Sequence, residues 1–253
     1  MSDKYVRIAL VTGATSGIGE ATARRFVAAG FGVVGNGRTV AKLAVLEKEL
    51  GPAFCGVAGD FGSHTVLDRL FAAASERFGR SADIVVANAG IGLGGSVKNA
   101  DLSKFGDVVR TNVVSTLALL QKAAQKMEVK QLRSYPQSAA DIVIVGSIAG
   151  RHVSAHSAVY AATKSAVHGL AEGLRREVGP NGVRVTLIEP GIVLSGFQSA
   201  AGYSDELVDG FKTKFGPVLI GADVANAIHY IVTQPPHVHV SDIVIRPTRQ
   251  DYP

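Results

Sequence analysis

The segment LVTGATSGIGEATARRF, residues Leu10 to Phe26, decides the fold of this chain. An apolar and β-branched run, Ala9–Thr12, leads directly into three glycines, Gly13, Gly17 and Gly19. A helical pattern rich in Ala and Arg follows them. A strand that turns through glycines into a helix is typical of the first unit of an α/β fold that binds a dinucleotide.

The helix that begins in this segment is predicted to bind phosphate at its N-terminus. The first N–H groups of a helix have no partner within the helix, and the helix dipole is positive there. We expect Gly13 to make the turn out of the strand, Gly17 to let a phosphate reach the backbone, and Gly19 to let the helix pack on the strand. Thr15 and Ser16 add hydroxyls to the same loop. The spacing G-x-x-x-G-x-G lacks the Gly-Lys-Ser/Thr of a P-loop, so a nucleoside triphosphatase is disfavoured.

Strand-like and helix-like segments alternate along all 253 residues. The predicted strands are Val6–Thr12, Gly32–Asn36, Ala53–Val57, Ile84–Ala87, Asp141–Gly146, Val183–Ile188 and Asp242–Ile245. The predicted helices are Glu20–Ala29, Val40–Leu50, Thr65–Phe78, Leu102–Glu128, Ala158–Val178 and Ala222–Val232. Unbroken apolar runs such as Ile142–Val145 are typical of parallel strands buried on both faces. With no repeat or composition break, the pattern predicts one doubly wound α/β domain over residues 1–253.

Composition and charge exclude several classes of protein. The chain is 47% hydrophobic and its net charge is +5, but its basic residues are spread along helical patterns, which disfavours a nucleic-acid-binding surface. No apolar run has the roughly 18–20 residues of a membrane helix, and no signal peptide precedes the glycines, so we expect a soluble cytoplasmic protein. The lone Cys55 is interpreted as a buried apolar residue. His152 and His156 have no carboxylate or cysteine at ligand spacing, so no metal site is predicted.

A second group of residues predicts redox chemistry. Tyr160 and Lys164 are four residues apart on a helical pattern and so share one face. Ser147 follows a strand and is expected at the carboxyl edge of the sheet, where ligands bind in open α/β folds. Tyr160 is a suitable acid for an alkoxide formed by hydride transfer, and the Lys164 ammonium is expected to lower its pKa of about 10 by roughly 1–3. The Ser147 hydroxyl can polarise a carbonyl. Each residue alone has an ordinary role as a cap or a surface residue, but their joint occurrence favours catalysis.

These motifs resemble the classical short-chain dehydrogenase/reductases. The resemblance rests on TGATSGIG (Thr12–Gly19), NAG (Asn88–Gly90), Asn112, Ser147, YAATK (Tyr160–Lys164) and PG (Pro190–Gly191), which occur in the order and spacing of that family, from Val6 to about Ile245. It implies a seven-stranded parallel sheet of order 3-2-1-4-5-6-7, a nicotinamide cofactor and a homotetramer or homodimer. It also implies an enzyme that interconverts an alcohol with a ketone or aldehyde.

The resemblance assigns roles to individual residues. The implied catalytic residues are Asn112, Ser147, Tyr160 and Lys164, where Lys164 also holds the nicotinamide ribose and Asn112 supports a water that connects Lys164 to solvent. Asp60 would contact the adenine, Asn88, Ala89 and Gly90 the adenosine ribose, and the Ile192 backbone the carboxamide. The complete expected cofactor site comprises Gly13, Thr15, Ser16, Gly17, Ile18, Gly19, Arg38, Thr39, Asp60, Phe61, Asn88, Ala89, Gly90, Tyr160, Lys164, Pro190, Gly191, Ile192 and Ser195.

The end of the second strand predicts which nicotinamide cofactor is used. A site that prefers NAD ends this strand with Asp or Glu, whereas this chain has Gly37, followed by Arg38 and Thr39. A guanidinium at Arg38 can bind a 2′-phosphate, and Thr39 adds a hydroxyl. Arg38 can also be read as a solvated residue at the start of a helix. We therefore predict a preference for NADP(H), with NAD as a possible cofactor.

The substrate is not encoded in the motifs. Residues 195–216 are predicted to form a mobile substrate lid with one short helix, in which Phe197, Tyr203 and Phe211 either line a pocket or seal the lid. The tail DIVIRPTRQ resembles the serine and 3-hydroxy acid dehydrogenase branch, which implies small polar hydroxy or oxo substrates. The segment Lys130–Asp141 is expected to be a surface loop. A non-catalytic NADP(H)-sensing regulator and an epimerase or dehydratase of the extended branch are the alternatives.

Overall fold

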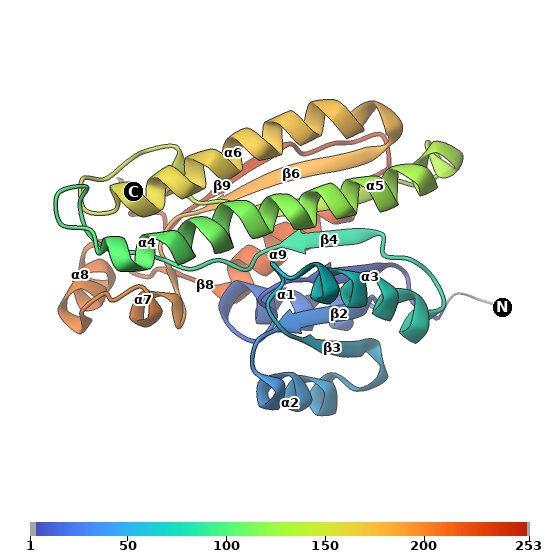
Figure 1. Cartoon of the computed structure of the whole chain (residues 1–253), viewed down its shortest axis with the longest axis horizontal. Helices are drawn as coiled ribbons and strands as arrows, with labels where there is room; N and C mark the ends of the chain where they lie inside the picture. Colours follow the sequence, from blue (N-terminus) through green and yellow to red (C-terminus); the bar gives the residue numbers. More distant parts are fainter. Residues whose placement is uncertain (1–3, 252–253) are drawn as a thin grey trace.

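Seven parallel strands form the central sheet of the computed structural model, which describes residues 4–251 (Figure 1). They are β1 (Ile8–Val11), β2 (Gly32–Gly37), β3 (Phe54–Ala58), β4 (Ile84–Ala87), β5 (Ala140–Val145), β6 (Val183–Pro190) and β9 (Asp242–Ile245). Their order is β3-β2-β1-β4-β5-β6-β9, with every neighbouring pair parallel. Because β9 is the seventh strand of this sheet, the order 3-2-1-4-5-6-7 implied by the resemblance is confirmed.

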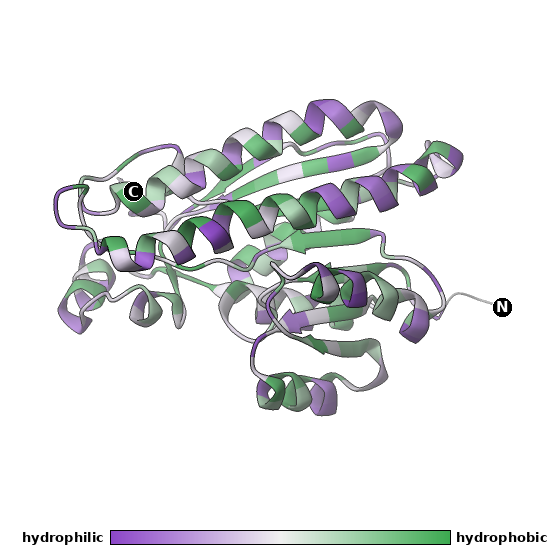
Figure 2. Cartoon of the chain, in the orientation of Figure 1, coloured by the Kyte–Doolittle hydropathy of each residue, from purple (hydrophilic) through white to green (hydrophobic). Residues whose placement is uncertain are grey.

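Helices cover both faces of the sheet, as a doubly wound fold requires (Figure 1). Ile8 and Leu10 point to one face and pack with α3, α5 and α6, whereas Ala9 and Val11 point to the other and pack with α1, α2 and α9. This alternation follows from the two-residue period of a strand, and it explains why the strands are apolar on both sides (Figure 2). The α-helices of the two faces are α1 (Gly17–Ala28), α2 (Val40–Leu50), α3 (His64–Phe78), α4 (Leu102–Val109), α5 (Thr116–Ser134), α6 (Ala158–Val178) and α9 (Gly221–Val232).

The long helix predicted over Leu102–Glu128 is interrupted and extended. A π-helical segment, Arg110–Ser115, separates α4 from α5, and α5 continues to Ser134. The expected surface loop at Lys130–Asp141 is therefore wrong over its first five residues. Tertiary contacts explain the extra turns, because the Lys130 ammonium pairs with Asp83 at 2.6 Å and Gln131 is buried.

The predicted lid region has more regular structure than expected. It contains two helices, α7 (Phe197–Ala200) and α8 (Asp205–Phe215), where the sequence predicted one. A small parallel sheet of β7 (Val193–Leu194) and β8 (Leu219–Ile220) joins the two ends of the segment. In Figure 1, α7 and α8 project beyond the sheet at the end where α4 begins. The remaining short helices, all 3-10, are Gly51–Ala53, Ile148–Gly150 and Gly179–Asn181. None of the helices between residues 4 and 251 combines the length and apolar character needed to cross a bilayer.

Candidate active site

The glycine loop after β1 lies directly against α1 and β4. A Cβ at Gly19 would lie 2.2 Å from the carbonyl oxygen of Gly13, so only glycine permits this helix to approach the strand so closely. Gly13 and Gly17 have φ values of +66° and +55°, which favour glycine. α1 begins at Gly17, so the N–H groups of its first turn belong to the predicted phosphate loop. The loop therefore has the shape and the free backbone donors that a pyrophosphate requires.

Ser147 and Tyr160 come together at the carboxyl edge of the sheet. Ser147 follows β5 and caps a 3-10 turn, where its Oγ accepts a 3.1 Å hydrogen bond from the Ala149 N–H. Tyr160 lies in the first turn of α6, and its hydroxyl is close enough to the Ser147 hydroxyl for Ser147 to influence the pKa of Tyr160. The structure therefore joins two residues that are 13 positions apart in sequence through the geometry of the β5–α6 connection.

Lys164 is buried beneath Tyr160 on the same helix. Its Nζ lies 5.8 Å from the centre of the Tyr160 ring and donates a 2.9 Å hydrogen bond to the carbonyl oxygen of Val145. Burial lowers the pKa of Lys164 from 10.5 to about 8. The shared helix face predicted from the four-residue spacing is present.

The direction of the Tyr160 pKa differs from the sequence prediction. Burial raises the pKa of Tyr160 above its ordinary value of 10, and the hydrogen bond from Ser147 opposes part of that rise. Burial dominates, so the pKa of Tyr160 does not fall as the neighbouring Lys164 led the sequence to predict. Tyr160 is therefore protonated at neutral pH, as a proton donor must be.

Asn112 occupies the π-helical segment between α4 and α5. Its side chain, which is 2% exposed, donates to the Ile91 carbonyl oxygen at 2.8 Å and to the Thr163 Oγ1 at 3.1 Å. Its Oδ1 accepts from the Ile91 N–H at 2.9 Å. Asn112 thus joins the loop after β4 to α6 beside Tyr160. Local π-helical turns are frequent at functional sites. Thr163 was not predicted, because its role depends on how two distant helices pack.

The N-A-G motif after β4 ties that strand to the glycine loop. Asn88 Nδ2 donates to the Thr12 carbonyl oxygen at 2.8 Å, and the N–H groups of Asn88 and Ala89 both donate to Thr12 Oγ1 at 3.1 Å. A Cβ at Gly90 would lie 3.2 Å from the Asn112 Oδ1 and 3.7 Å from the Lys164 Nζ. The motif therefore lies between the glycine loop and the residues predicted to be catalytic.

The end of β2 contains the residues predicted to select the cofactor. Gly37 is buried, and a Cβ there would lie 2.5 Å from the Thr15 Cγ2, whereas Arg38 and Thr39 are exposed. Asp60 is also exposed at the neighbouring end of β3, where its Oδ1 accepts from the Gly62 N–H, and the adjoining Phe61 is buried. This edge offers a free guanidinium beside the glycine loop and no room for a larger residue at position 37.

Two glutamines that the sequence did not reveal bind the backbone of residues 190–195. The Ile192 N–H donates to the Gln250 Oε1 at 3.0 Å, and Gln198 bonds both the Ser195 N–H (3.1 Å) and the Val193 carbonyl oxygen (2.6 Å). Ser195 also faces the glycine loop, since a Cβ at Gly17 would lie 3.1 Å from the Ser195 Cβ. The Ile192 N–H, expected to face a carboxamide, thus binds a side-chain amide here. No local pattern marks either glutamine, because each reaches its partner only through the folded turn.

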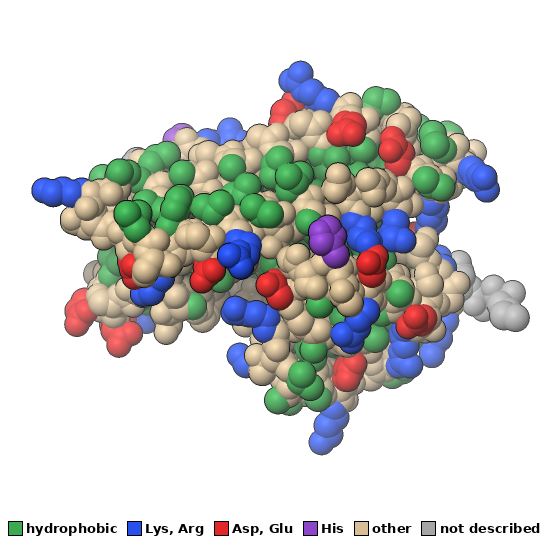
Figure 3. Space-filling view, in the orientation of Figure 1, with side chains coloured by type: hydrophobic (Ala, Val, Ile, Leu, Met, Phe, Trp, Pro, Cys, Tyr) green, Lys and Arg blue, Asp and Glu red, His purple; other side chains and the backbone are tan. Residues whose placement is uncertain are grey.

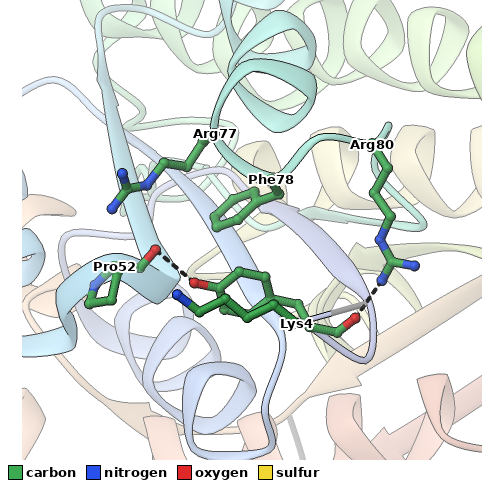
Figure 4. A pocket seen from close by; sticks show the side chains of 6 residues that line it. Lys4, Pro52, Arg77, Phe78 and Arg80 are labelled. Atoms are coloured by element: carbon green, nitrogen blue, oxygen red, sulfur yellow. Dashed lines mark hydrogen bonds between the residues drawn. The ribbon is translucent and has the colours of Figure 1, made fainter. Parts of the chain in front are cut away.

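A pocket of about 210 Å³ lies elsewhere, around Tyr5 and Phe78 (Figure 4). Its lining residues are Lys4, Tyr5, Pro52, Arg77, Phe78 and Arg80, and none belongs to the predicted site. Tyr5 donates to the Pro52 carbonyl oxygen, and Arg80 donates to the Tyr5 carbonyl oxygen (Figure 4). These bonds fasten the segment before β1 to the 3-10 helix Gly51–Ala53 and to the loop that follows α3. In the part of the chain that the structure describes, no three His, Cys, Asp or Glu side chains gather to hold a metal ion.

Comparison with known proteins agrees with this geometry. Residues 7–205 match the family described as short chain dehydrogenase. The chain is 34% identical over 245 residues to a serine 3-dehydrogenase of Agrobacterium fabrum, covering 96% of this chain and 94% of the relative. It is also 34% identical over 242 residues to an uncharacterized oxidoreductase of Staphylococcus aureus strain MW2, covering 95% of this chain and 97% of that one.

Solved structures with the same fold include two described as cofactor complexes. The closed form of serine dehydrogenase complexed with NADP+ superposes with a TM-score of 0.86 at 30% identity, covering 97% of this chain and 96% of that one. A 3-ketoacyl-(acyl-carrier-protein) reductase from Brucella melitensis complexed with NADH has a TM-score of 0.86 at 26% identity, covering 97% and 98%. The family match covers most of the chain, and the order of the motifs and the geometry of the site agree with it. This chain therefore belongs to the short-chain dehydrogenase/reductase family of oxidoreductases.

Proposed function

We propose that this chain uses NADP(H) to interconvert a secondary alcohol with a ketone, or a primary alcohol with an aldehyde. The observation that carries the proposal is the meeting of Ser147, Tyr160 and Lys164 at the carboxyl edge of the sheet, beside the glycine loop. The relatives described as serine 3-dehydrogenases favour a small polar hydroxy or oxo substrate.

The residues of the chain supply binding, orientation and proton transfer. A bound nicotinamide cofactor supplies the exchange of a hydride with the substrate carbon. In the direction of reduction, the Tyr160 hydroxyl gives its proton to the substrate oxygen as negative charge develops there, and the Ser147 hydroxyl donates a hydrogen bond to the same oxygen. In oxidation, Tyr160 accepts the alcohol proton. The Lys164 ammonium stabilises the phenolate that remains after Tyr160 has given up its proton.

The site fits such a cofactor on several counts. The N–H groups of Gly17, Ile18 and Gly19 begin a 12-residue helix and suit a pyrophosphate. Asn88, Ala89 and Gly90 lie between this loop and Lys164, where a ribose would be held. The residues at the end of β2 favour the phosphorylated cofactor, with Gly37 in place of an acid and Arg38 exposed beside it. The complexes of the structural neighbours with NADP+ and with NADH support a nicotinamide cofactor of either form.

A cofactor-oxidation screen tests the proposal directly. Purified protein with NADPH is presented with oxo acids, sugars, acyl ketones and aldehydes, and with NADP+ and the matching alcohols. Tyr160→Phe should lower kcat by roughly 10²–10⁴-fold while NADPH still binds, because only the proton donor is removed. Substantial turnover by that variant would exclude Tyr160 as the acid. Tight NADPH binding without turnover of any compound would favour a cofactor-sensing regulator instead.

We also propose a cytoplasmic homotetramer or homodimer. Exposed apolar residues lie along α4, the π-helical segment Arg110–Ser115 and α5, where apolar side chains gather on the surface shown in Figure 3. These residues include Leu102, Val114, Leu117, Val129 and Leu132. Single exposed apolar residues are common on protein surfaces, whereas a group of them along one face is typical of a contact surface, and this group suits a contact with a second copy. Light scattering at micromolar concentration should give a multiple of 26.3 kDa, and a monomeric mass would contradict the assembly.

A further inference from the structure

Phe197 from the lid segment lies against the catalytic tyrosine. It is the first residue of α7, and its ring centre is 5.6 Å from that of Tyr160, with the two planes inclined by 59°. The other aromatic residues of the segment pack among themselves, with Tyr203 and Phe211 at 6.3 Å and Phe211 and Phe215 at 6.4 Å. Of these lid aromatics, Phe197 is the one in ring contact with the catalytic residue.

A glycine on the opposite loop makes room for this ring. A Cβ at Gly92 would lie 2.6 Å from the Phe197 Cζ and 2.6 Å from the Ala201 Cβ. Gly92 follows Asn88–Gly90 and Ile91, the residue whose backbone Asn112 binds. Phe197 therefore lies between the catalytic helix and a loop fixed by a catalytic residue, so its ring has little freedom to retreat on that side.

Backbone hydrogen bonds hold the three surrounding segments together. The Gly94 N–H donates to the Ala201 carbonyl oxygen at 3.3 Å, which ties the loop after β4 to the end of α7. The Gly95 N–H donates to the His156 carbonyl oxygen at 3.1 Å, which ties the same loop to the segment before α6. At its other end, the Phe197 N–H donates to the Ser195 Oγ at 3.2 Å. The backbone of α7, which carries Phe197, is thus hydrogen bonded at both of its ends.

We propose that Phe197 is a specificity-determining residue that restricts the enzyme to compact substrates with a short chain on the reacting carbon. The inference rests on the proposed function and deepens it. A substrate whose oxygen reaches the Tyr160 hydroxyl has its carbon skeleton beside the Phe197 ring. Because Gly92 on the facing loop has no side chain, the ring keeps this position. One methylene in such an apolar enclosure changes kcat/KM by roughly 10–200-fold. Residues with smaller side chains at position 197 would admit longer chains.

Straight-chain aldehydes from propanal to octanal, reduced with NADPH, give the test. The readout is the ratio of kcat/KM for octanal to that for propanal. Phe197→Ala should raise this ratio by at least about tenfold over the unmodified enzyme. Phe211→Ala is the matched control, since it removes an aromatic ring of the same segment that packs on Tyr203 and Phe215, and it should leave the ratio within about twofold. Gly92→Ala should lower the ratio or leave it low, because a methyl there presses the ring toward Tyr160.

Two results would overturn the proposal. One is an unchanged ratio in a folded Phe197→Ala variant that still binds NADPH. The other is a change in KM for NADPH alone, which would assign the ring to the cofactor and not to the substrate. If neither these aldehydes nor any other compound of the cofactor-oxidation screen is turned over, the proposed function fails. Phe197 is then judged from binding of the matching primary amides to the enzyme–NADPH complex, followed by NADPH fluorescence. Phe197→Ala must shift the ratio of affinities for the longer and the shorter amide toward the longer one by at least about tenfold. The same ratio in the variant and in the unmodified protein would refute the proposal for Phe197.

Discussion

Lys164 donates a hydrogen bond of 2.9 Å from its buried Nζ to the carbonyl oxygen of Val145, the last residue of β5. The bond joins α6 to the strand that leads into Ser147. The hydrogen bond also holds the Lys164 ammonium where it is almost entirely shielded from water. This burial lowers the pKa of Lys164 to about 8. A charge retained at such a position is a cost to stability that serves the site.

Replacing Lys164 by methionine should change how stability depends on pH. In the unfolded chain the lysine pKa is about 10.4, so between about pH 8 and 10.4 the unfolded state binds more protons than the folded state. The free energy of unfolding of the unmodified protein should therefore rise relative to Lys164→Met over this range, by up to about 1.4 kcal/mol per pH unit. Urea denaturation of both proteins at pH 7.5, 8.5 and 9.5 measures the difference. A constant difference would show that Lys164 is not held at a lowered pKa.

Arg38→Ala should remove the preference for NADPH. A charge-assisted hydrogen bond contributes roughly 1.5–3 kcal/mol, so kcat/KM for NADPH should exceed that for NADH by at least about tenfold in the unmodified enzyme and lose most of that advantage in the variant. Lys42→Ala is the control, because Lys42 is an exposed cation one turn further along α2. Equal kcat/KM values for the two cofactors in the unmodified enzyme would show that Arg38 does not bind the phosphate.

Full reversal of this preference needs a third substitution. Gly37→Asp with Arg38→Ala supplies the acid of an NAD site, but the new Cβ would lie 2.5 Å from the Thr15 Cγ2. Thr15→Ser removes that methyl group. We expect the triple variant to prefer NADH and the double variant to bind both cofactors more weakly. Steady-state kinetics with both cofactors compares the two.

Arg151 and Glu189 link the loop after Ser147 to the end of β6. The Glu189 carboxylate is fully buried and accepts two hydrogen bonds from the Arg151 guanidinium, at 2.9 and 2.5 Å. Among the residues that the structure describes, Arg151→Ala leaves His168, whose Nδ1 is 3.7 Å away, as the basic side chain nearest to this carboxylate. Because half of the Arg151 side chain is exposed, we expect a loss of about 1–2 kcal/mol of unfolding free energy, less than for a fully buried pair. Adding Glu189→Gln to Arg151→Ala should restore part of the lost unfolding free energy, because the buried charge is then removed. Urea denaturation of the two single variants and the double variant measures this, and a double variant whose loss equals the sum of the two single losses would contradict the pairing.

Asp141, near the start of β5, forms ion pairs with two arginines at the amino end of the sheet. Arg7 contacts its carboxylate at 2.6 Å and Arg184 at 2.8 Å, and Asp141 is 1% exposed. Asp141→Asn should lower the free energy of unfolding by about 3–5 kcal/mol, because it leaves two largely buried cations without an opposite charge. Asp68→Asn, which breaks an exposed pair with Lys122, should have little effect in the same urea titration. Similar midpoints for the two variants would contradict the assignment.

Local pattern was sufficient for most of the fold. The seven strands of the central sheet were predicted with ends within two residues of those observed, because apolar runs flanked by turn residues are typical of buried parallel strands. The two-residue strands β7 and β8 were not predicted. The long helix was not, because the π-helical segment at Arg110–Ser115 and the last turns of α5 depend on partners such as Ile91 and Asp83 that are distant in sequence. The second helix of the lid was also missed, since α7 is only four residues long and is held by Ser195 and Gln198.

The sequence by itself determined which residues meet at the carboxyl edge of the sheet. Gly13 and Ser147 each follow a predicted strand, and helix period places Tyr160 and Lys164 on one face, without knowledge of any contact. Only the tertiary structure decided the electrostatics and the enclosure of the site. Burial of Tyr160 raises its pKa where the sequence predicted a fall, and Phe197 packs on that ring because Gly92, more than a hundred residues earlier, leaves the space. Desolvation and close packing depend on everything that surrounds a group, and most of those surroundings are distant along the chain.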